Sequence, residues 1–158
     1  MSIEEYTLES TQHPPPTVLF VDDEPAILSA LKRLTKRRDW NVLIADSGFA
    51  ALTVLREIHV DLIVSDMKMP VMSGPEFLGH AYEKYPDIRK LVLTGHSDMR
   101  MTVQAINEGH IFGFINKPWD NRDLLETLEF HLDDRDIVEN KVKWTSTKKK
   151  NGAKPSLK

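Results

Sequence analysis

Cysteine is absent from the 158 residues of the chain. The protein can therefore form neither a disulfide bond nor a metal site built on thiolates, and a reducing cytoplasm suits this composition. No apolar run approaches the roughly 18 residues that a membrane-spanning helix requires, so membrane insertion is not expected. The first residues carry Glu4, Glu5 and Glu9 instead of a basic region before an apolar core, which argues against a signal peptide.

Positive charge is scarce over most of the chain. Residues 139–158 hold seven lysines and one glutamate, a charge of +6, so the other 138 residues must carry −9 to give the net charge of −3. An acidic body argues against a surface there that binds nucleic acid directly. The lysine-rich end is more simply explained as a solvated terminus than as a contact with nucleic acid or acidic lipid.

The composition divides the chain into three parts. Residues 1–16 are expected to be a disordered leader, because they end in consecutive prolines that provide no hydrogen-bond donors. Residues 17–132 are the predicted folded domain, and residues 133–158 are expected to be a helix extension followed by a lysine-rich, mobile tail. Nothing after Leu132 has the length of an output domain. The chain is then either a stand-alone unit that acts through partner binding or the front of a larger regulator.

The folded part repeats one pattern, an apolar strand followed by a helix. The predicted strands cover residues 18–21, 41–45, 62–66, 91–93 and 111–115. Successive strand–helix units imply a parallel sheet, and right-handed crossovers place helices on both of its faces. Five units are too few for an eight-stranded barrel. We therefore predict an α/β fold, a flavodoxin-like doubly wound five-stranded parallel sheet of order 2-1-3-4-5.

Apolar residues at helical spacing predict the last two helices. The first of these runs from about Asp98 to Gly109 and is expected to bury Met101, Ala105 and Ile106. The final helix follows Asp120 and carries four apolar positions, namely Leu124, Leu125, Leu128 and Leu132.

Polar residues stand at the carboxyl ends of four of the predicted strands. They are Asp22 and Asp23 after the first strand, Asp66 at the end of the third, Thr94 after the fourth and Lys117 after the fifth. Open α/β sheets bind their ligands at this edge, and in the order 2-1-3-4-5 the first and third strands are neighbours. The three aspartates should therefore converge, and such carboxylates repel one another unless a cation neutralises them. Mg²⁺ fits this supply of oxygen ligands, whereas zinc does not, because the histidines are scattered.

Together these residues describe a site that accepts a phosphoryl group. Asp66 would be the nucleophile, Lys117 adds a cation and Thr94 adds a hydroxyl donor, and phosphoryl transfer needs mainly positioning and charge neutralisation. Each residue also has an ordinary structural explanation: Asp23 as a helix cap, Thr94 as a turn residue and Lys117 as a solvated charge. Their occurrence at one edge of one sheet favours the functional interpretation.

These motifs make the chain resemble the response-regulator receiver domains of bacterial two-component systems, over roughly residues 17–132. The matching motifs are Asp22-Asp23, Asp66-Met67-Lys68-Met69-Pro70 with Gly74, Thr94-Gly95 and Lys117-Pro118. The resemblance implies that Asp66 accepts a phosphoryl group from the phosphohistidine of a sensor histidine kinase or a histidine phosphotransfer protein. It also implies that the protein is not a dedicated enzyme, although it would dephosphorylate itself.

The resemblance further implies how a metal would be held. Mg²⁺ would be bound directly by Asp23, Asp66 and the backbone carbonyl of Lys68, with Asp22 acting through water. The side chain of Lys68 overlooks the expected phosphate position, where it would alter hydrolysis of the acyl phosphate, but a solvent-pointing lysine is the simpler expectation.

The remaining implied roles concern signalling. Thr94 would bind the phosphoryl oxygens, and Lys117 would pair with Asp66 or its phosphate. Phe114 stands where the family keeps its switching aromatic, with a plain core residue of the fifth strand as the alternative. A downstream effector protein or domain would read the switch, and homodimerisation is left open.

Two rival functions come from other classes. An interaction module that keeps the fold without cycling phosphate would have no need to retain Asp23, Asp66, Thr94 and Lys117 together. A phosphatase-type hydrolase with an aspartyl nucleophile needs a second acid two residues further on, where this chain has Lys68.

Overall fold

The structure, a computed structural model, describes residues 14–95 and 98–133. The predicted mobile tail lies outside these residues, as does all of the predicted leader except its last three residues. Within the described ranges, no helix is long and apolar enough to cross a membrane.

Five parallel strands form one sheet. They are β1 (Thr17–Val21), β2 (Asn41–Ala45), β3 (Leu62–Asp66), β4 (Arg89–Thr94) and β5 (Gly113–Asn116), arranged in the order β2-β1-β3-β4-β5. This order confirms the predicted flavodoxin-like topology. The fifth strand begins at Gly113 rather than at Ile111, because Ile111 packs, partly buried, against the apolar core before the strand starts.

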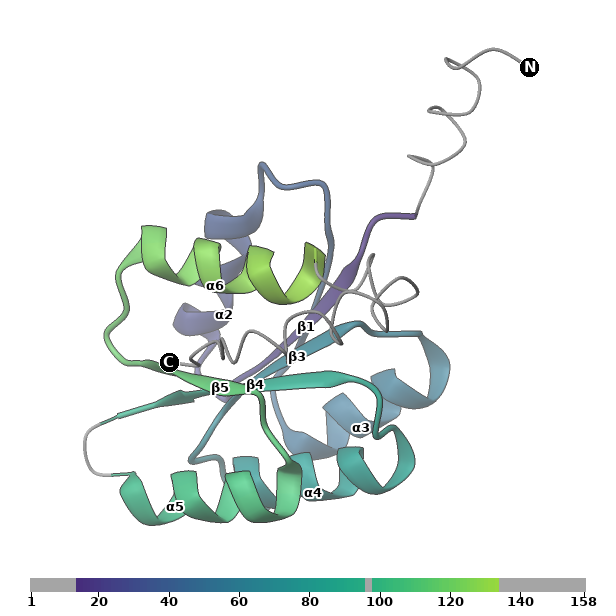
Figure 1. The fold of residues 1–158 in the computed structure, drawn as a ribbon, viewed down its shortest axis with the longest axis vertical. Coiled ribbons are helices and arrows are strands. Elements are labelled where there is room, and N and C mark those ends of the chain that lie inside the picture. The colour runs from purple at the N-terminus through teal and green to yellow at the C-terminus, as the bar shows by residue number, and fades with distance from the viewer. Residues whose placement is uncertain (1–13, 96–97, 134–158) are drawn as a thin grey trace, which may run out of the picture.

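Helices cover both faces of the sheet, as predicted (Figure 1). On one face lie α2 (Pro25–Thr35) and α6 (Asn121–Asp133), and on the other lie α3 (Gly48–Glu57), α4 (Gly74–Lys84) and α5 (Met99–Gln104). α5 continues as a π-helical segment, η1 (Ala105–Gly109). The sheet is thus the middle of three layers.

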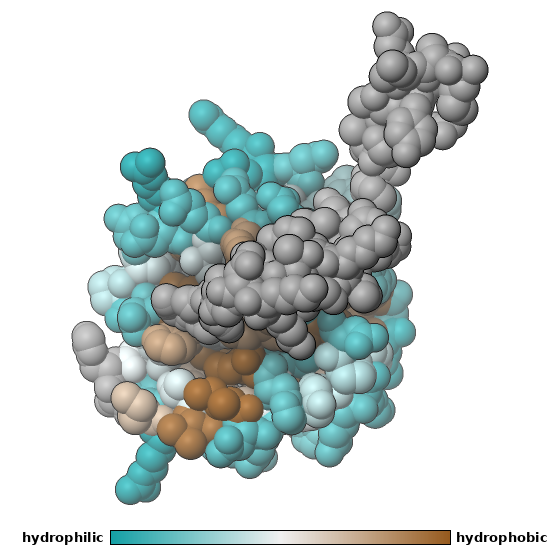
Figure 2. Space-filling model, in the orientation of Figure 1, coloured by the Kyte–Doolittle hydropathy of each residue, from teal (hydrophilic) through white to brown (hydrophobic). Residues whose placement is uncertain are grey.

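One prediction for the helix from about Asp98 to Gly109 is wrong, because one of its expected core residues is exposed. Ile106 is 49% exposed, whereas Ala105 and Gly109 of η1 are buried. A Cβ atom at Gly109 would lie only 2.7 Å from the Cβ of Leu78 in α4, so the two backbones approach closely at this point. The close approach selects small residues for the contact and leaves Ile106 on the outside. Apolar side chains accordingly gather over α5 and β5 on an otherwise largely hydrophilic face (Figure 2).

Local chemistry explains where α3 and α4 begin. The hydroxyl of Ser47 accepts a hydrogen bond from the Ala50 N–H at the start of α3. Ser73 and Glu76 form a reciprocal capping box at the start of α4, each side chain accepting from the backbone N–H of the other. Such caps satisfy N–H groups that have no partner inside the helix.

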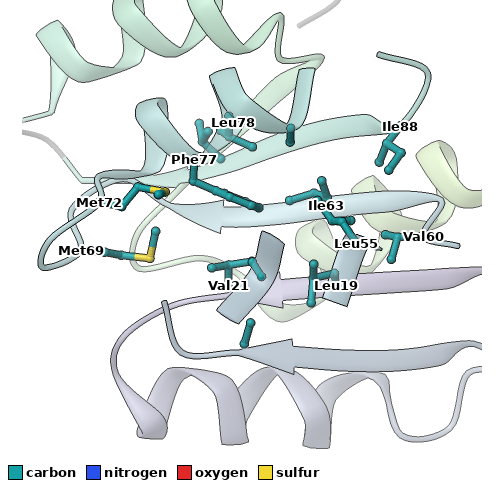
Figure 3. Close-up of a cluster of buried hydrophobic side chains, with 14 of the residues drawn as sticks. Leu19, Val21, Leu55, Val60, Ile63, Met69, Met72, Phe77, Leu78 and Ile88 are labelled. Carbon is teal, nitrogen blue, oxygen red and sulfur yellow. The ribbon is translucent and has the colours of Figure 1, made fainter. Parts of the chain in front are cut away.

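Two apolar clusters fill the space between the layers. Figure 3 shows the cluster beneath α3 and α4, where Leu19 and Ile63 of the central strands lie near Phe77. On the opposite face of the sheet, Phe20 packs in a cluster with Leu124 of α6. β1 and β3 are buried along their whole length, which explains the apolar runs at residues 18–21 and 62–64. Polar residues that follow these strands are therefore held on a rigid base.

Candidate functional site

Three carboxylates meet at the carboxyl ends of β1 and β3. β1 and β3 are hydrogen-bonded neighbours, with Val21 opposite Ser65, so Asp22, Asp23 and Asp66 emerge side by side. One carboxylate oxygen from each aspartate lies within 4.8 Å of the others. Asp22 and Asp66 are buried and Asp23 is half-buried. The convergence expected from the strand order is therefore present in the structure.

The charge of this cluster is only partly compensated by the protein. Burial raises the pKa of Asp22 to about 6, and the charge of Asp66 acts in the same direction. A hydrogen bond from the Glu24 N–H, 2.9 Å from Asp22 Oδ1, and the charge of Lys117 oppose this rise in the pKa without cancelling it. A site with such unfavourable ionisation gains from a bound cation.

Lys117 provides the protein's own cation at this edge. Its Nζ atom lies 2.8 Å from Asp66 Oδ1 and 3.5 Å from Asp22 Oδ2. The backbone N–H of Lys117 donates to the Thr94 carbonyl at 2.8 Å, which fixes the loop after β5 against the end of β4. Burial acts to lower the pKa of Lys117, but its contacts with Asp66 and Asp22 outweigh burial and raise the pKa. The lysine is thus held in its charged form.

Thr94 lies at the same edge but its hydroxyl is turned toward α5. The Thr94 hydroxyl lies 3.3 Å from the Thr102 hydroxyl and 3.3 Å from the Gly95 carbonyl, and its single proton can be donated to only one of them at a time. Its side chain is buried. A role in binding phosphoryl oxygens would require this hydroxyl to leave Thr102.

Phe114 is an exposed residue of β5, opposite Val92 of β4. Its exposed fraction is 55%, so the alternative of a plain core residue is wrong. Together with Trp119 and Leu124 it lines a pocket of about 370 Å³ between β5 and α6.

Sequence reasoning missed an ion pair that joins two loops of the site. The side chain of Lys68 is 60% exposed, in line with the expected solvated lysine, but its Nζ atom also lies 3.2 Å from Oδ1 of Asp98. Asp98 is buried, and its Oδ2 accepts a hydrogen bond from the Gly95 N–H at 2.9 Å. This hydrogen bond, aided by Lys68, lowers the pKa of Asp98. The only sequence signal was an acid at the expected start of a helix, which is a common position for a structural aspartate.

Known proteins resemble this chain in sequence and in fold. A family model described as the response regulator receiver domain matches residues 18–129. The hydrogenase transcriptional regulatory protein HoxA of Cupriavidus necator is 36% identical over 112 residues, which are 71% of this chain and 23% of HoxA. The sensor kinase CckA of Brucella abortus is 33% identical over 122 residues, 76% of this chain and 13% of CckA. The chain therefore spans less than a quarter of the length of these two relatives.

A solved structure gives the same result for the fold. The crystal structure of a response regulator receiver domain protein from Clostridium thermocellum superimposes with a TM-score of 0.71 at 30% identity, covering 78% of this chain and 98% of that one. The residues matched by the family model include all three aspartates, Thr94 and Lys117. By sequence and topology, the chain belongs to the family of response regulator receiver domains.

Proposed function

We propose that the protein is a phosphorylation-controlled switch in which Asp66 accepts the phosphoryl group. The geometry at Asp66 carries this proposal. Lys117 Nζ and the Met67 N–H both contact Oδ1, at 2.8 and 2.9 Å, so Oδ1 is held in place. Among the described residues no hydrogen bond is made to Oδ2, which leaves this oxygen as the nucleophile.

The proposed donor is the phosphohistidine of a sensor histidine kinase or a histidine phosphotransfer protein. A bond forms between Asp66 Oδ2 and phosphorus while the phosphorus–nitrogen bond breaks, and the histidine nitrogen keeps the electron pair. Lys117 stays beside the new acyl phosphate and offsets its charge. Receiver domains interact with histidine kinases and effector domains, and the relatives of this chain include a sensor kinase and transcriptional regulators.

Receiver domains bind Mg²⁺ through acidic residues, and the acidic cluster here suits such an ion. The donor set is hard oxygen, and a cation would relieve the unfavourable ionisation of Asp22. We assign Asp23, Asp66 and the backbone carbonyl of Lys68 as direct ligands, with Asp22 acting through water. When bound, Mg²⁺ would neutralise charge on the transferring phosphoryl oxygens.

The proposed signal passes through Thr94 to Phe114. A phosphoryl group adds charge and strong acceptor oxygens, which would draw the Thr94 hydroxyl away from Thr102. The space vacated at the end of β4 would allow the exposed ring of Phe114 to be buried, which is favourable. The face formed by α5, β5 and α6 would then change shape, and an effector would prefer one of its two forms.

Receiver domains of response regulators are generally not dedicated enzymes. We propose that the phosphorylated chain hydrolyses its own acyl phosphate. The folded domain is proposed to span residues 17–132. The proposed partner of the α5–β5–α6 face is an effector protein or domain, with a second copy of the chain as the alternative.

The test is phosphorylation by acetyl phosphate in the presence of Mg²⁺. The intact protein should gain the mass of one phosphate, and Asp66→Asn should gain none. Asp39→Asn is a matched control, because Asp39 is an exposed aspartate outside the site. Equal labelling of Asp66→Asn would refute the assignment, undiminished labelling in excess chelator would refute the metal, and absence of labelling in every form would favour an interaction module.

A further inference from the structure

Asp98 occupies a central place among the contacts beside the proposed phosphorylation site. Its carboxylate holds the Lys68 ammonium group at 3.2 Å and the Gly95 N–H at 2.9 Å. Its backbone carbonyl accepts hydrogen bonds from the Thr102 N–H at 2.9 Å and from the Thr102 hydroxyl at 3.0 Å. One residue thus connects the loop after Asp66 to the first turn of α5.

The Thr102 hydroxyl extends these contacts to Thr94, which it meets at 3.3 Å. Contacts therefore run without a break from Lys68 through Asp98 and Thr102 to Thr94. Lys68 follows Asp66 by two residues and its side chain is 60% exposed, so the ammonium group is free to exchange partners. Within the described part of the chain its ion pair is with Asp98 and not with Asp66.

We propose that Asp98 is a positioning residue that keeps Lys68 away from Asp66 until phosphorylation, and that transfer of Lys68 to the phosphoryl group releases the start of α5. This inference rests on the proposed phosphorylation of Asp66. A phosphoryl group carries more charge than a carboxylate and has three strong acceptor oxygens, so it competes well for the lysine. Asp98 would then lose the cation that helps to hold its buried carboxylate against the Gly95 N–H. The release would reach α5 by a path separate from movement of Thr94.

Because the ion pair must break, it opposes phosphorylation by its own free energy. Asp98→Asn removes the charge but keeps an oxygen that can accept from the Gly95 N–H, so this hydrogen bond should persist. Lys68→Gln removes the ammonium group but leaves the backbone carbonyl, the proposed magnesium ligand, in place. These two substitutions and their combination form a double-mutant cycle.

The probe is beryllofluoride with Mg²⁺, a mimic of a phosphoryl group on a carboxylate, with the affinity measured by titration calorimetry. Asp98→Asn should bind the mimic about fivefold more tightly than the wild type, the effect of releasing one partly exposed ion pair. In the Lys68→Gln background, the same substitution should change the affinity by less than about twofold. Asp39→Asn and Lys32→Gln, at exposed positions outside the site, control for the change in net charge.

An equal effect of Asp98→Asn in both backgrounds would overturn the proposal, because it would show a structural role that does not act through Lys68. Failure of Asp98→Asn to tighten binding would also overturn it. If the wild type does not bind the mimic at all, the proposed phosphorylation of Asp66 is itself refuted. Binding by the wild type without tighter binding by Asp98→Asn refutes only the role of Asp98, so the two failures are distinguishable.

If Asp98→Asn does not fold, NMR on Lys68→Gln answers the same question. The mimic should shift the amide signals of Asp98 and Thr102 in the wild type, and these shifts should shrink in Lys68→Gln while the shift of Met67 persists. Unchanged shifts of Asp98 and Thr102 in Lys68→Gln would overturn the proposal.

Discussion

Two lysines are largely shielded from water at opposite edges of the sheet, one at the edge where the parallel strands end and one at the edge where they begin. Lys117 follows β5 at the carboxyl edge, and its ammonium group faces the carboxylates of Asp66 and Asp22. Lys90 lies at the start of β4, is 1% exposed, and donates to the carbonyls of Ile88 and Tyr85 at 2.6 and 3.5 Å. Neutral carbonyls and the ring of Tyr82, 5.5 Å away, are its nearest partners.

The two environments move the pKa in opposite directions. Burial lowers the pKa of Lys90 to about 8, although the charge of Asp87 opposes this change. At Lys117 burial acts in the same direction, but the two carboxylates prevail and raise the pKa. Burial alone therefore does not make a lysine functional. A lysine that must stabilise a phosphoryl group needs carboxylate partners that keep it charged.

The largest expected effect is on the rate of phosphorylation, which should depend on Lys117 and not on Lys90. Lys117→Met should slow labelling of Asp66 by acetyl phosphate between about a hundredfold and a thousandfold, because it removes the preorganised cation. Lys90→Met lies at the other edge and should change the labelling rate by less than about twofold. Mass spectrometry over a time course measures both rates. A similar slowing in both variants would show that Lys117 acts through stability alone.

The buried Lys90 should also make the stability of the protein depend on pH, with the second largest expected effect. The pKa of Lys90 is 10.5 in a model compound and about 8 in the folded chain. Below pH 8 both states hold the proton, so the folded state bears the whole burial penalty. Between pH 8 and 10.5 the unfolded chain binds more protons, and the free energy of unfolding should rise with pH by about 3 kcal/mol in total. Urea unfolding of the wild type and Lys90→Met measures this difference, and equal pH slopes would contradict it.

Asp22, at the edge where the strands end, should likewise make the stability of the protein depend on pH. In the metal-free protein burial raises its pKa from 3.8 to about 6, so the folded state binds this proton more tightly and stability falls as pH rises through that range. Asp22→Asn should therefore raise the free energy of unfolding at pH 7 by about 3 kcal/mol. Added Mg²⁺ should reduce the advantage, because it stabilises the wild type more. A variant that is less stable than the wild type without metal would disprove this account.

The difference between the edges also explains what the sequence could predict. Apolar runs located the strands, and strand order brings Asp22 beside Asp66, because topology decides which strand ends are neighbours. Lys117 follows β5, which is not a neighbour of β3, and its long side chain reaches Asp66 past the end of β4. The pair between Lys68 and Asp98 could not be predicted, because it depends on how closely two loops approach, and no spacing along the chain encodes that distance. The exposure of Ile106 was missed for a similar reason.

Burial of Lys90 was equally hidden from the sequence. A lysine just before an apolar run is usually solvated, but in the fold the carbonyls of Ile88 and Tyr85 and the ring of Tyr82 lie around its ammonium group. Periodicity reports which face of an element is apolar. It does not report which polar groups the packing of distant elements will enclose.

The smallest expected effect concerns backbone strain, which differs between the edges too. Among the described residues other than glycine, positive φ occurs at Val71, 70°, in the loop from β3 to α4, and at His110, 52°, before β5. The ring of His110 stacks on Tyr82 with centroids 3.8 Å apart, whereas Val71 is 89% exposed. A β-branched residue is strongly disfavoured in this conformation, and asparagine tolerates it.

Val71→Asn should therefore raise the free energy of unfolding by somewhat less than about 1 kcal/mol, because it relieves strain and gives up almost no buried surface. His110→Asn is the matched control: it also suits positive φ but loses the ring contact, so it should not stabilise the protein. Urea unfolding compares the two variants. We expect Val71→Asn to label at the wild-type rate, since the exposed valine side chain supplies no contact to Asp66. Slower labelling in a more stable protein would instead mean that the strained loop helps to set the position of the acceptor, and strain would then join charge as a second property that distinguishes the functional edge of the sheet.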